Sequence, residues 1–394
     1  MNKLVIISHV THYRYLNRLW AYSPFAREIE LWADIFSQVH IACPLQSKEP
    51  PNDYSPLEHK NIVVRPVPER GGNLLKSKIR QVISLPNMVW KLISAMRQAD
   101  AIQVRSPGNL GLLGAALAPL FSKHICAKYA GQWLDYPGEA TSYRLQKRIL
   151  SSKWFRGPVF VYGRWPNQPS HIIPFFTSVM EASQMAEAKE VTKAIRFNPI
   201  PRILFVGRLS TAKNVDKLLY ALSALRQKNI AFECHIIGEG PEGSTLRNLS
   251  HQLGLTSCIQ FDGGLPFPSV LNHYSQADIL VLASETEGWP KAVAEGMAFG
   301  LVCVASNRGL VPQMLSHGRG ILVEPGDILD LQNKIEHILQ NPNQYLDLRQ
   351  HAADWAQQFT TEQLRSAFAS VLSEWWNIDL EYAEHGKNWR PTFD

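Results

Sequence analysis

Several features that mark specialised classes of protein are missing from this sequence of 394 residues. The five cysteines lie far apart and form no C-x-x-C pair, so neither a disulfide framework nor a cysteine-based zinc site is expected. They are Cys43, Cys126, Cys234, Cys258 and Cys303. An odd, scattered set is typical of buried thiols in a reducing compartment, which predicts a cytoplasmic protein.

Long hydrophobic runs are absent too. The longest, 110–121, has about 12 residues, against the roughly 20 that a helix needs to cross a bilayer. The apolar run at 4–7 has the length of a buried strand and is too short for the core of a secretory signal. We therefore expect neither a membrane-spanning helix nor a secretory signal.

The sequence contains no Asp-x-Asp motif and no carboxylate cluster with the spacing of Mg²⁺ or Mn²⁺ ligands. We expect an activity that needs no metal ion and no bound cofactor.

The front half of the chain, in contrast, is rich in positive charge. Residues 1–190 contain 23 Lys and Arg against 13 Asp and Glu, a net charge of +10, whereas the whole chain carries +6. This imbalance suggests two domains with different partners, and the basic domain could meet an anionic lipid surface, nucleic acid or an anionic substrate. Neither a basic-aromatic single-strand pattern nor a recognition-helix motif supports nucleic acid.

Short apolar runs alternate with segments of helical period through most of the chain. Strands are expected at 4–8, 39–42, 63–67, 101–104 and 124–129, and again at 202–206, 233–237, 259–261, 279–283, 302–305 and 320–323. Helices are expected at 25–36, 90–96, 108–121, 215–227, 244–253 and 362–376. This alternation predicts right-handed crossovers and mostly parallel sheets.

The expected fold is therefore α/β, with two Rossmann-like domains facing across a cleft. The proline-containing segment 198–201 is the candidate boundary, which gives domains 1–197 and 198–372. The final segment, 373–394, is expected to return to the first domain.

A glycine-led loop follows the expected strand at 202–206. Residues 206–214 are Val-Gly-Arg-Leu-Ser-Thr-Ala-Lys-Asn, so Arg208 and Lys213 are five residues apart. Two cations beside strand ends can bind a diphosphate, Arg as a bidentate fork and Lys as a point charge. Asn214 suits the N-cap of the following helix. An ordinary solvated loop would explain this segment equally well.

A second loop and helix, at 284–298, carry two carboxylates. Glu287 and Glu295 are eight residues apart, and Pro290 suits the first position of a helix of small residues. Carboxylate oxygens accept hydrogen bonds from ribose and sugar hydroxyls. The amides at the start of the helix can bind phosphate oxygens.

These two segments resemble glycosyltransferase family 4, whose members are retaining enzymes with the GT-B fold. E-G-W-P-K-A-V-A-E-G-M-A is similar to the E-x7-E motif of that family, and G-R-L-x-x-x-K-N to its diphosphate-binding segment. The resemblance covers 202–327, and the stretches 23–42 and 105–114 also look like some bacterial polysaccharide transferases of the family.

The resemblance implies a role for each matching residue. Arg208 and Lys213 would neutralise the diphosphate of a nucleotide sugar, both in binding and as the leaving group departs. Glu287 would contact hydroxyls of the transferred sugar, and Glu295 those of the ribose. Further donor contacts would come from Gly288, Trp289, Pro290, Gly238 and Gly240. Trp289 could equally serve as a packing residue.

The first domain departs from the family pattern. Many members carry a glycine-rich loop after the first strand, but the loop at 8–15 contains no glycine. Many also place a histidine after a middle strand, whereas here that strand ends in Val-Arg-Ser-Pro at 104–107. Two replacements are considered: Arg105 in that place as an acceptor contact, or His12 in the catalytic function, although a histidine in such a loop is more often structural.

The implied activity is retaining transfer of a sugar from a nucleotide diphosphate, with uridine favoured over guanosine. The acceptor would be a glycan or lipid-linked saccharide of cell-surface polysaccharide synthesis, and the basic first domain would sit on the anionic inner face of the membrane. Two alternatives stay open: a nucleotide-sugar epimerase or phosphorylase on the same fold, and a non-catalytic nucleotide-sugar-binding protein.

Overall fold

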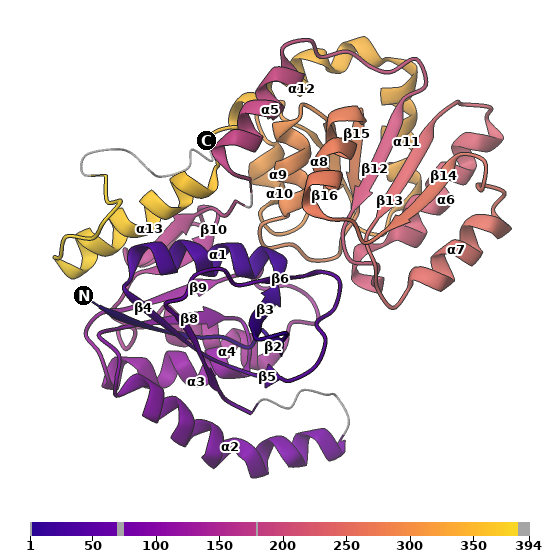
Figure 1. Ribbon diagram of the computed structural model, residues 1–394. Helices are drawn as coiled ribbons and strands as arrows, with labels where there is room; N and C mark the ends of the chain where they lie inside the picture. Colours follow the sequence, from indigo (N-terminus) through magenta and orange to yellow (C-terminus); the bar gives the residue numbers. More distant parts are fainter. Residues whose placement is uncertain (1, 69–74, 179, 385–394) are drawn as a thin grey trace. The chain divides into compact units, whose positions relative to one another are not determined.

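The computed structural model describes the backbone of residues 2–68, 75–178 and 180–384, and the side chains of all of these except 75–83. The chain forms two compact units (Figure 1). Of the described residues, unit 1 contains 2–68, 75–178 and 361–384, and unit 2 contains 180–360. The sequence places the boundaries later, at 197/198 and 372/373. They fall earlier in the structure because α5 (Ala182–Thr192) packs on helices of unit 2 and α13 (Thr361–Trp376) packs on unit 1.

Unit 1 is built around a seven-stranded sheet of order β11-β10-β9-β8-β1-β4-β7, in which every pair is parallel. Its strands are β1 (Lys3–Ile7), β4 (Gln38–Cys43), β7 (Ile62–Pro66), β8 (Ala101–Ser106), β9 (Ile125–Tyr129), β10 (Val159–Tyr162) and β11 (Ile172–Phe175). The sequence predicts the first five but misses β10 and β11. The strand order reverses between β1 and β8, which makes this the topological switch point of the sheet.

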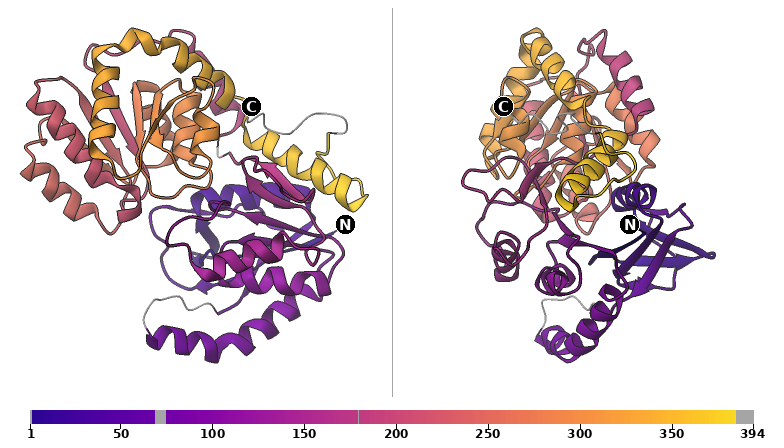
Figure 2. Two further views of the ribbon diagram at one scale, coloured as in Figure 1. Left: turned by 180° about the vertical axis from the view of Figure 1, so that it is seen from behind. Right: turned by 90° about the vertical axis from the view of Figure 1, so that its left-hand side faces the viewer.

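The last long helix completes the core of unit 1. Phe368 of α13 packs on Trp32 of α1 (Ser23–Ile35), with ring centroids 4.5 Å apart, and on Phe160 and Phe175 of the sheet at 5.2 and 4.8 Å. Figure 2 shows α13, in yellow, beside α1, in indigo. The other helices of unit 1 are α2 (Leu75–Met96), α3 (Asn109–Leu117) and α4 (Thr141–Leu150). A segment remote in sequence is thus part of the first core.

A small four-stranded sheet follows the first strand of unit 1. It has the order β5-β2-β3-β6, with β2 (His12–Tyr15), β3 (Arg18–Tyr22), β5 (Leu45–Gln46) and β6 (Tyr54–Pro56). Leu16 and Asn17 join β2 to β3 with φ values of 48° and 57°, as a two-residue type I′ turn requires. The segment after β1 lacks glycine because it enters a hairpin strand.

Unit 2 has the strand order of a dinucleotide-binding fold. Its six parallel strands run β14-β13-β12-β15-β16-β17, so the order reverses between β12 and β15. The strands are β12 (Arg202–Val206), β13 (Glu233–Ile237), β14 (Ile259–Gly263), β15 (Ile279–Leu282), β16 (Val302–Ser306) and β17 (Ile321–Val323). The sequence predicts all six. Two Rossmann-like sheets in one chain confirm the expected α/β class.

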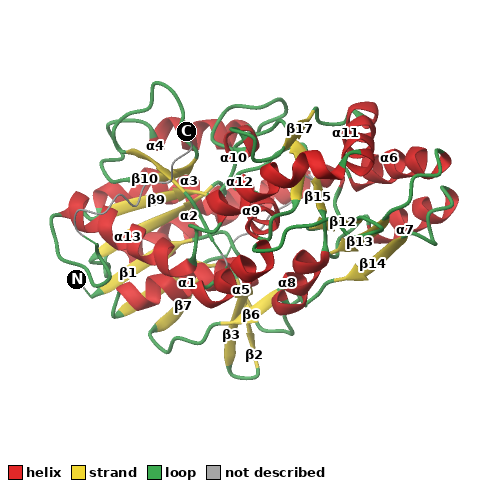
Figure 3. Ribbon diagram, turned by 90° about the horizontal axis from the view of Figure 1, so that it is seen from above, coloured by secondary structure: helices red, strands yellow, loops and turns green. Residues whose placement is uncertain are grey.

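Helices cover both faces of the unit 2 sheet. They are α6 (Val215–Gln227), α7 (Gly243–Gln252), α8 (Phe267–Gln276), α9 (Lys291–Ala298), α10 (Val311–Leu315), α11 (Ile328–Gln340) and α12 (Leu346–Ala356). Figure 3 shows α6 and α11 side by side on one face and α8 on the other. Four leucines of α6, which are Leu218, Leu219, Leu222 and Leu225, are all buried. No helix in the described parts of the chain has both the length and the apolar character that a bilayer crossing requires.

Candidate functional site

Two loops meet at the switch point of unit 2. The β12 loop (207–214) follows β12, and the β15 loop (283–290) follows β15. Asn214, which is buried and has a left-handed φ of 50°, donates from Nδ2 to the carbonyl oxygen of Ala283 at 2.9 Å and to Oε1 of Glu285 at 2.7 Å. Asn214 is the N-cap residue of α6, as the sequence predicts, but its side chain forms no capping hydrogen bond. Its amide instead joins the two loops, and the amide N–H of Glu285 donates to the carbonyl of Ala212 in support.

This junction brings one cation and one carboxylate of the sequence motifs into contact. Nζ of Lys213 lies 2.5 Å from Oε1 of Glu287, and the two side chains are 24% and 9% exposed. Arg208 is exposed in the same loop and forms no ion pair with the described residues. A lysine ammonium has three donors, so contact with Glu287 leaves Lys213 able to bind an anion as well. The edge of the sheet therefore offers two positive groups and one carboxylate.

Gly238 and Gly240 are required by backbone packing beside the β12 loop. A Cβ on Gly238 would lie 1.9 Å from the carbonyl oxygen of Gly207, and one on Gly240 would lie 2.2 Å from that of Leu209. The amide of Leu209 also donates to the carbonyl of Glu239 at 2.9 Å. The ends of β12 and β13 are thus locked together, and both predicted glycines lie at that contact.

Glu295 lies inside α9, eight residues after Glu287. It is 8% exposed, and Oε2 accepts a hydrogen bond of 2.9 Å from the hydroxyl of Tyr274 on α8. Burial, followed by the nearby Glu295 charge, raises the pKa of Tyr274 well above its ordinary value, so the hydroxyl stays a donor. Tyr274 therefore orients this carboxylate. Sequence reasoning missed that partner, because Tyr274 belongs to a helix that the pattern does not predict.

The aromatic ring of Trp289 belongs to the core of unit 2. It is 6% exposed, stacks on Trp355 with centroids 6.2 Å apart and meets Phe359 edge-on at 5.4 Å. Of the two roles considered for this residue, the packing role fits the ring. Gly288 is partly exposed in the β15 loop, and Pro290 is the N-cap of α9 rather than its first helical residue.

The candidate residues of unit 1 lie near its own switch point. His12 is fully buried in β2, where Nδ1 lies 2.9 Å from the carbonyl oxygen of Val10 and the ring packs edge-on against Phe25. His9, directly after β1, is exposed instead. It touches the turn after β8, since a Cβ on Gly108 would lie 2.7 Å from Nδ1 of His9. Burial makes a structural role for His12 easy to explain, and a catalytic role for it stays a prediction.

Arg105 belongs to a buried cluster of three charges. Its Nη1 lies 2.9 Å from Oε1 of Glu28, whose Oε2 lies 2.9 Å from Nζ of Lys128. The side chains of Glu28 and Lys128 are 4% and 0% exposed, and the Arg105 guanidinium covers the ring of Phe25 at 4.7 Å. Only one guanidinium nitrogen is used in the ion pair, so the ion pair alone does not rule out acceptor binding. Acceptor binding by Arg105 stays a prediction. Neither ion pair could be predicted from the sequence, because Arg105 lies 77 residues from Glu28 and Lys128 lies 100 residues from it.

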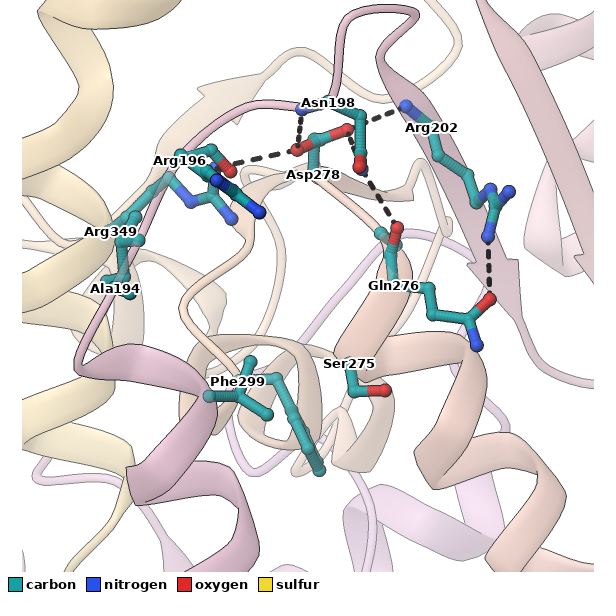
Figure 4. A pocket seen from close by; sticks show the side chains of 12 residues that line it. Ala194, Arg196, Asn198, Arg202, Ser275, Gln276, Asp278, Phe299 and Arg349 are labelled. Carbon is teal, nitrogen blue, oxygen red and sulfur yellow. Dashed lines mark hydrogen bonds and ion pairs between the residues drawn. The ribbon is translucent and has the colours of Figure 1, made fainter.

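A cavity of about 420 Å³ in unit 2 lies at the edge of the sheet opposite the two loops (Figure 4). Asp278, just before β15, is fully buried there and accepts hydrogen bonds from the amides of Asn198 and Arg202 at 3.1 and 2.8 Å. Arg349 lies 3.6 Å from the same carboxylate and donates to the carbonyls of Gly300 and Arg196. These charges hold the segment 196–202, which leads into β12.

Potential metal ligands gather at one place in the described residues, away from the two loops. His235, Asp262 and His273 each offer a ligand atom, and these atoms all lie within 4.8 Å of one another. The sequence contains no motif that links them, because they come from two strands and a helix.

Comparison with known proteins finds similarity to a protein family in the second half of the chain. Residues 189–355 match the family model described as glycosyl transferases group 1. An uncharacterized glycosyltransferase from Haemophilus influenzae is 30% identical over 173 residues, which is 43% of this chain and 48% of that protein. A GDP-mannose-dependent alpha-(1-6)-phosphatidylinositol monomannoside mannosyltransferase from Mycobacterium tuberculosis is 29% identical over 152 residues, 37% of this chain and 40% of that protein. The matches thus span less than half of the length of these relatives.

Solved structures resemble the chain over nearly its full length. Sucrose-phosphate synthase from Thermosynechococcus elongatus superposes with a TM-score of 0.69 and 19% identity, covering 96% of this chain and all of the other. Anabaena HepE in complex with UDP and glucose also reaches a TM-score of 0.69, at 15% identity, covering 95% of this chain and all of the other. The chain therefore has the GT-B type of α/β fold, and its residues 189–355 match the family model of group 1 glycosyl transferases.

Proposed function

We propose that this protein is a retaining glycosyltransferase that moves a sugar from a nucleotide diphosphate to a glycan or lipid-linked saccharide. The observation that carries the proposal is the meeting of Lys213 and Glu287, 2.5 Å apart, at the switch point where sheets of this topology bind nucleotides. A family match over 189–355 supports the same conclusion, because it includes both residues.

The charge balance of the two loops suits a diphosphate donor. Lys213 and Glu287 nearly neutralise each other, and exposed Arg208 adds one uncompensated positive charge beside them. A bound diphosphate would draw the three donors of Lys213 and the fork of Arg208 onto its oxygens. Glu287 would then be free to accept hydrogen bonds from sugar hydroxyls, while Glu295, held by Tyr274, would face the ribose.

The proposed chemistry is departure of the nucleotide and attack by the acceptor on the same face of the sugar. Negative charge develops on the diphosphate as the bond to the sugar breaks, and Arg208 and Lys213 are placed to stabilise it without a metal ion. The acceptor hydroxyl would pass its proton to the departing phosphate, so no paired acid and nucleophile of the hydrolase kind are needed. In unit 1 we assign the acceptor side to Arg105 and exposed His9, in preference to buried His12.

The nucleotide base is the open part of this proposal. HepE was solved with UDP, and the mycobacterial relative is named for GDP-mannose. We propose a uridine nucleotide as the first donor to test, with guanosine second.

Donor binding tests the proposal directly. We would titrate the full chain with UDP- and GDP-sugars, following the melting temperature, and then repeat the titration with Lys213→Met. Removing a charge-assisted contact to phosphate should weaken the best donor by at least about tenfold. Lys217→Met is the matched control, because Lys217 lies four residues further on and pairs with Asp216 on α6. Unchanged donor affinity in Lys213→Met would refute the site.

Product analysis separates the transferase from its alternatives. Incubation with donor alone would reveal an epimerised nucleotide sugar, and a requirement for inorganic phosphate would identify a phosphorylase. Transfer to an acceptor with the anomeric configuration of the donor retained would support our assignment. Binding without turnover under any of these conditions would favour a silent binding protein.

We also propose that unit 1 contacts an anionic membrane surface. Arg144 and Arg148 of α4 are exposed, and Lys153 and Arg156 follow on the surface together with Trp154, which is 47% exposed. Lys147, from the same basic stretch, is instead paired with Asp135 and Glu139. The basic residues 76, 78 and 80 of this prediction lie outside the described side chains. Binding to anionic but not neutral vesicles, lost at high salt, is the expected result.

A further inference from the structure

Three side chains with metal-ligand chemistry converge on the α8 face of the unit 2 sheet. His235 comes from the middle of β13, Asp262 from the end of β14 and His273 from α8. Their nearest ligand atoms all lie within 4.8 Å of one another, and Nδ1 of His235 is 2.9 Å from Oδ2 of Asp262. None of the three belongs to the motifs at the switch point.

A local irregularity of the sheet brings the carboxylate to this place. Ile236 pairs with Phe261, but the next residue, Ile237, pairs with Gly263. Asp262 is therefore the extra residue of a β-bulge, and bulges re-aim a side chain that regular pairing would place differently. The helix that follows β14 then carries His273 back over the same face. The rings of His235 and His273 have their centroids 5.2 Å apart.

The set of donor atoms matches what Zn²⁺ takes in sites with three protein ligands. Zn²⁺ binds imidazole nitrogen and carboxylate oxygen at about 2.0–2.2 Å, which puts tetrahedral ligand atoms about 3.4 Å apart. The 2.9 Å contact of His235 and Asp262 would open by about half an ångström on binding, and side-chain rotation can supply this. The second oxygen of Asp262 accepts a hydrogen bond of 2.6 Å from Gln260, the kind of support that orients a ligating carboxylate.

A plain hydrogen bond between His235 and Asp262 explains two of the three residues. It does not explain His273, whose Nδ1 is shielded from solvent and has no hydrogen-bond partner among the described residues. A buried polar atom without a partner costs free energy, and a third ligand position on a shared ion would account for its presence beside the pair.

We propose that His235, Asp262 and His273 bind one Zn²⁺, or a similar divalent transition-metal ion, and so fasten β13, β14 and α8 together. The ion would sit at the β13–β14 edge of the sheet, away from the two loops of the switch point. The site is independent of the glycosyltransferase activity. Either proposal can fail without the other.

Metal binding to the full, untagged chain tests the site. After removal of metals with a chelator, we would titrate the reduced protein with Co²⁺, follow the visible absorption of a low-coordinate ion, and then displace it with Zn²⁺. One ion per chain is expected, without the intense near-ultraviolet band of thiolate ligation. Zn²⁺ should also raise the melting temperature, because the folded state binds it and the unfolded chain lacks the arranged site.

Two variants and one control locate the ion. His273→Gln and Asp262→Asn should each weaken Zn²⁺ binding by at least about tenfold and remove the gain in melting temperature. Asp262→Asn keeps the shape of the side chain, so it reports on ligation even if His273→Gln disturbs α8. His251→Gln changes an exposed histidine of α7 and should bind Zn²⁺ as the wild type does. Less than a tenth of an ion per wild-type chain, a thiolate band, or full binding by both site variants would overturn the proposal.

Discussion

The switch points of the two units have the same topology, but their charged side chains differ in burial and in pairing. In unit 1, the carboxylate of Glu28 is shared by Arg105 and by Lys128, which is fully buried. In unit 2, Lys213 and Glu287 form a single, partly buried pair, with exposed Arg208 nearby. The three charges of unit 1 are part of the core. Lys213 and Glu287 of unit 2 can instead leave each other and contact a ligand.

This difference shows that charged residues beside strand ends need not have the same purpose. Lys128 also lies over the rings of Tyr162 and Phe368, at 5.6 and 5.2 Å, so its ammonium is enclosed by protein on several sides. Lys213 keeps 24% of its side chain exposed. A buried charge must keep its partner, whereas a surface pair can open at little cost.

The largest effect is expected from removing each carboxylate in turn. Glu28→Gln should lower the free energy of unfolding of unit 1 by about 3–5 kcal/mol, because it leaves Lys128 buried without a counter-charge. Glu287→Gln should lower that of unit 2 by less than about 1 kcal/mol, because Lys213 can turn to solvent. Hydrogen–deuterium exchange of β8 and β12 peptides reports the two units separately.

The double variant Glu28→Gln with Lys128→Met sharpens the same comparison. It should recover part of the lost stability, since no uncompensated charge remains in the core. Equal losses of unfolding free energy in Glu28→Gln and Glu287→Gln would show that the charges at the two switch points do not differ as described.

An intermediate effect is expected from acid. Burial lowers the pKa of His12 from 6.5 to about 4, so the folded state takes up its proton later than the unfolded chain as the pH falls. Between these values the unfolded state binds more protons, so His12 by itself should lower the stability of unit 1 by about 2 kcal/mol from pH 7 to pH 5.

His12→Asn should remove that part of the pH dependence, because an amide can also donate to the Val10 carbonyl but does not titrate in this range. Exchange of β1 peptides at the two pH values measures it. His317→Asn, at an exposed position of unit 2, is the control and should leave the pH dependence of β1 unchanged. A wild-type slope in His12→Asn would contradict the assignment.

The smallest effect concerns the amide that joins the two loops of unit 2. Asn214→Gly keeps the left-handed backbone but loses both side-chain hydrogen bonds, which should cost about 1–2 kcal/mol and weaken donor binding as the loops separate. Asn229→Gly is matched in backbone, with a φ of 58°, but lies exposed at the end of α6. Thermal unfolding and donor titration of both should show a loss only for Asn214→Gly.

The sequence predicts the frame of unit 2 well, because its strands are short apolar runs bounded by turns and its loops carry family motifs. β12, β13 and α6 begin and end at the expected residues. The expected roles of Arg208, Lys213, Glu287 and Glu295 stay predictions, but the structure does join Lys213 to Glu287, 74 residues away.

Contacts between remote residues could not be predicted in the same way. Glu28 meets Lys128 across 100 residues, and Tyr274 reaches Glu295 from a helix that the sequence pattern did not show. The bulge at Asp262 follows from pairing between strands, which no single segment encodes. Such features depend on how the elements pack, and the local sequence pattern does not predict this packing.

The return of α13 to unit 1 has a consequence for synthesis of the protein. Trp32, Phe160 and Phe175 are made early, but Phe368, which covers them, leaves the ribosome only after all of unit 2. Unit 2 is one continuous stretch and can complete its core at once, whereas the nascent unit 1 must wait with an uncovered aromatic surface. During translation the later-made half therefore finishes folding before the earlier one.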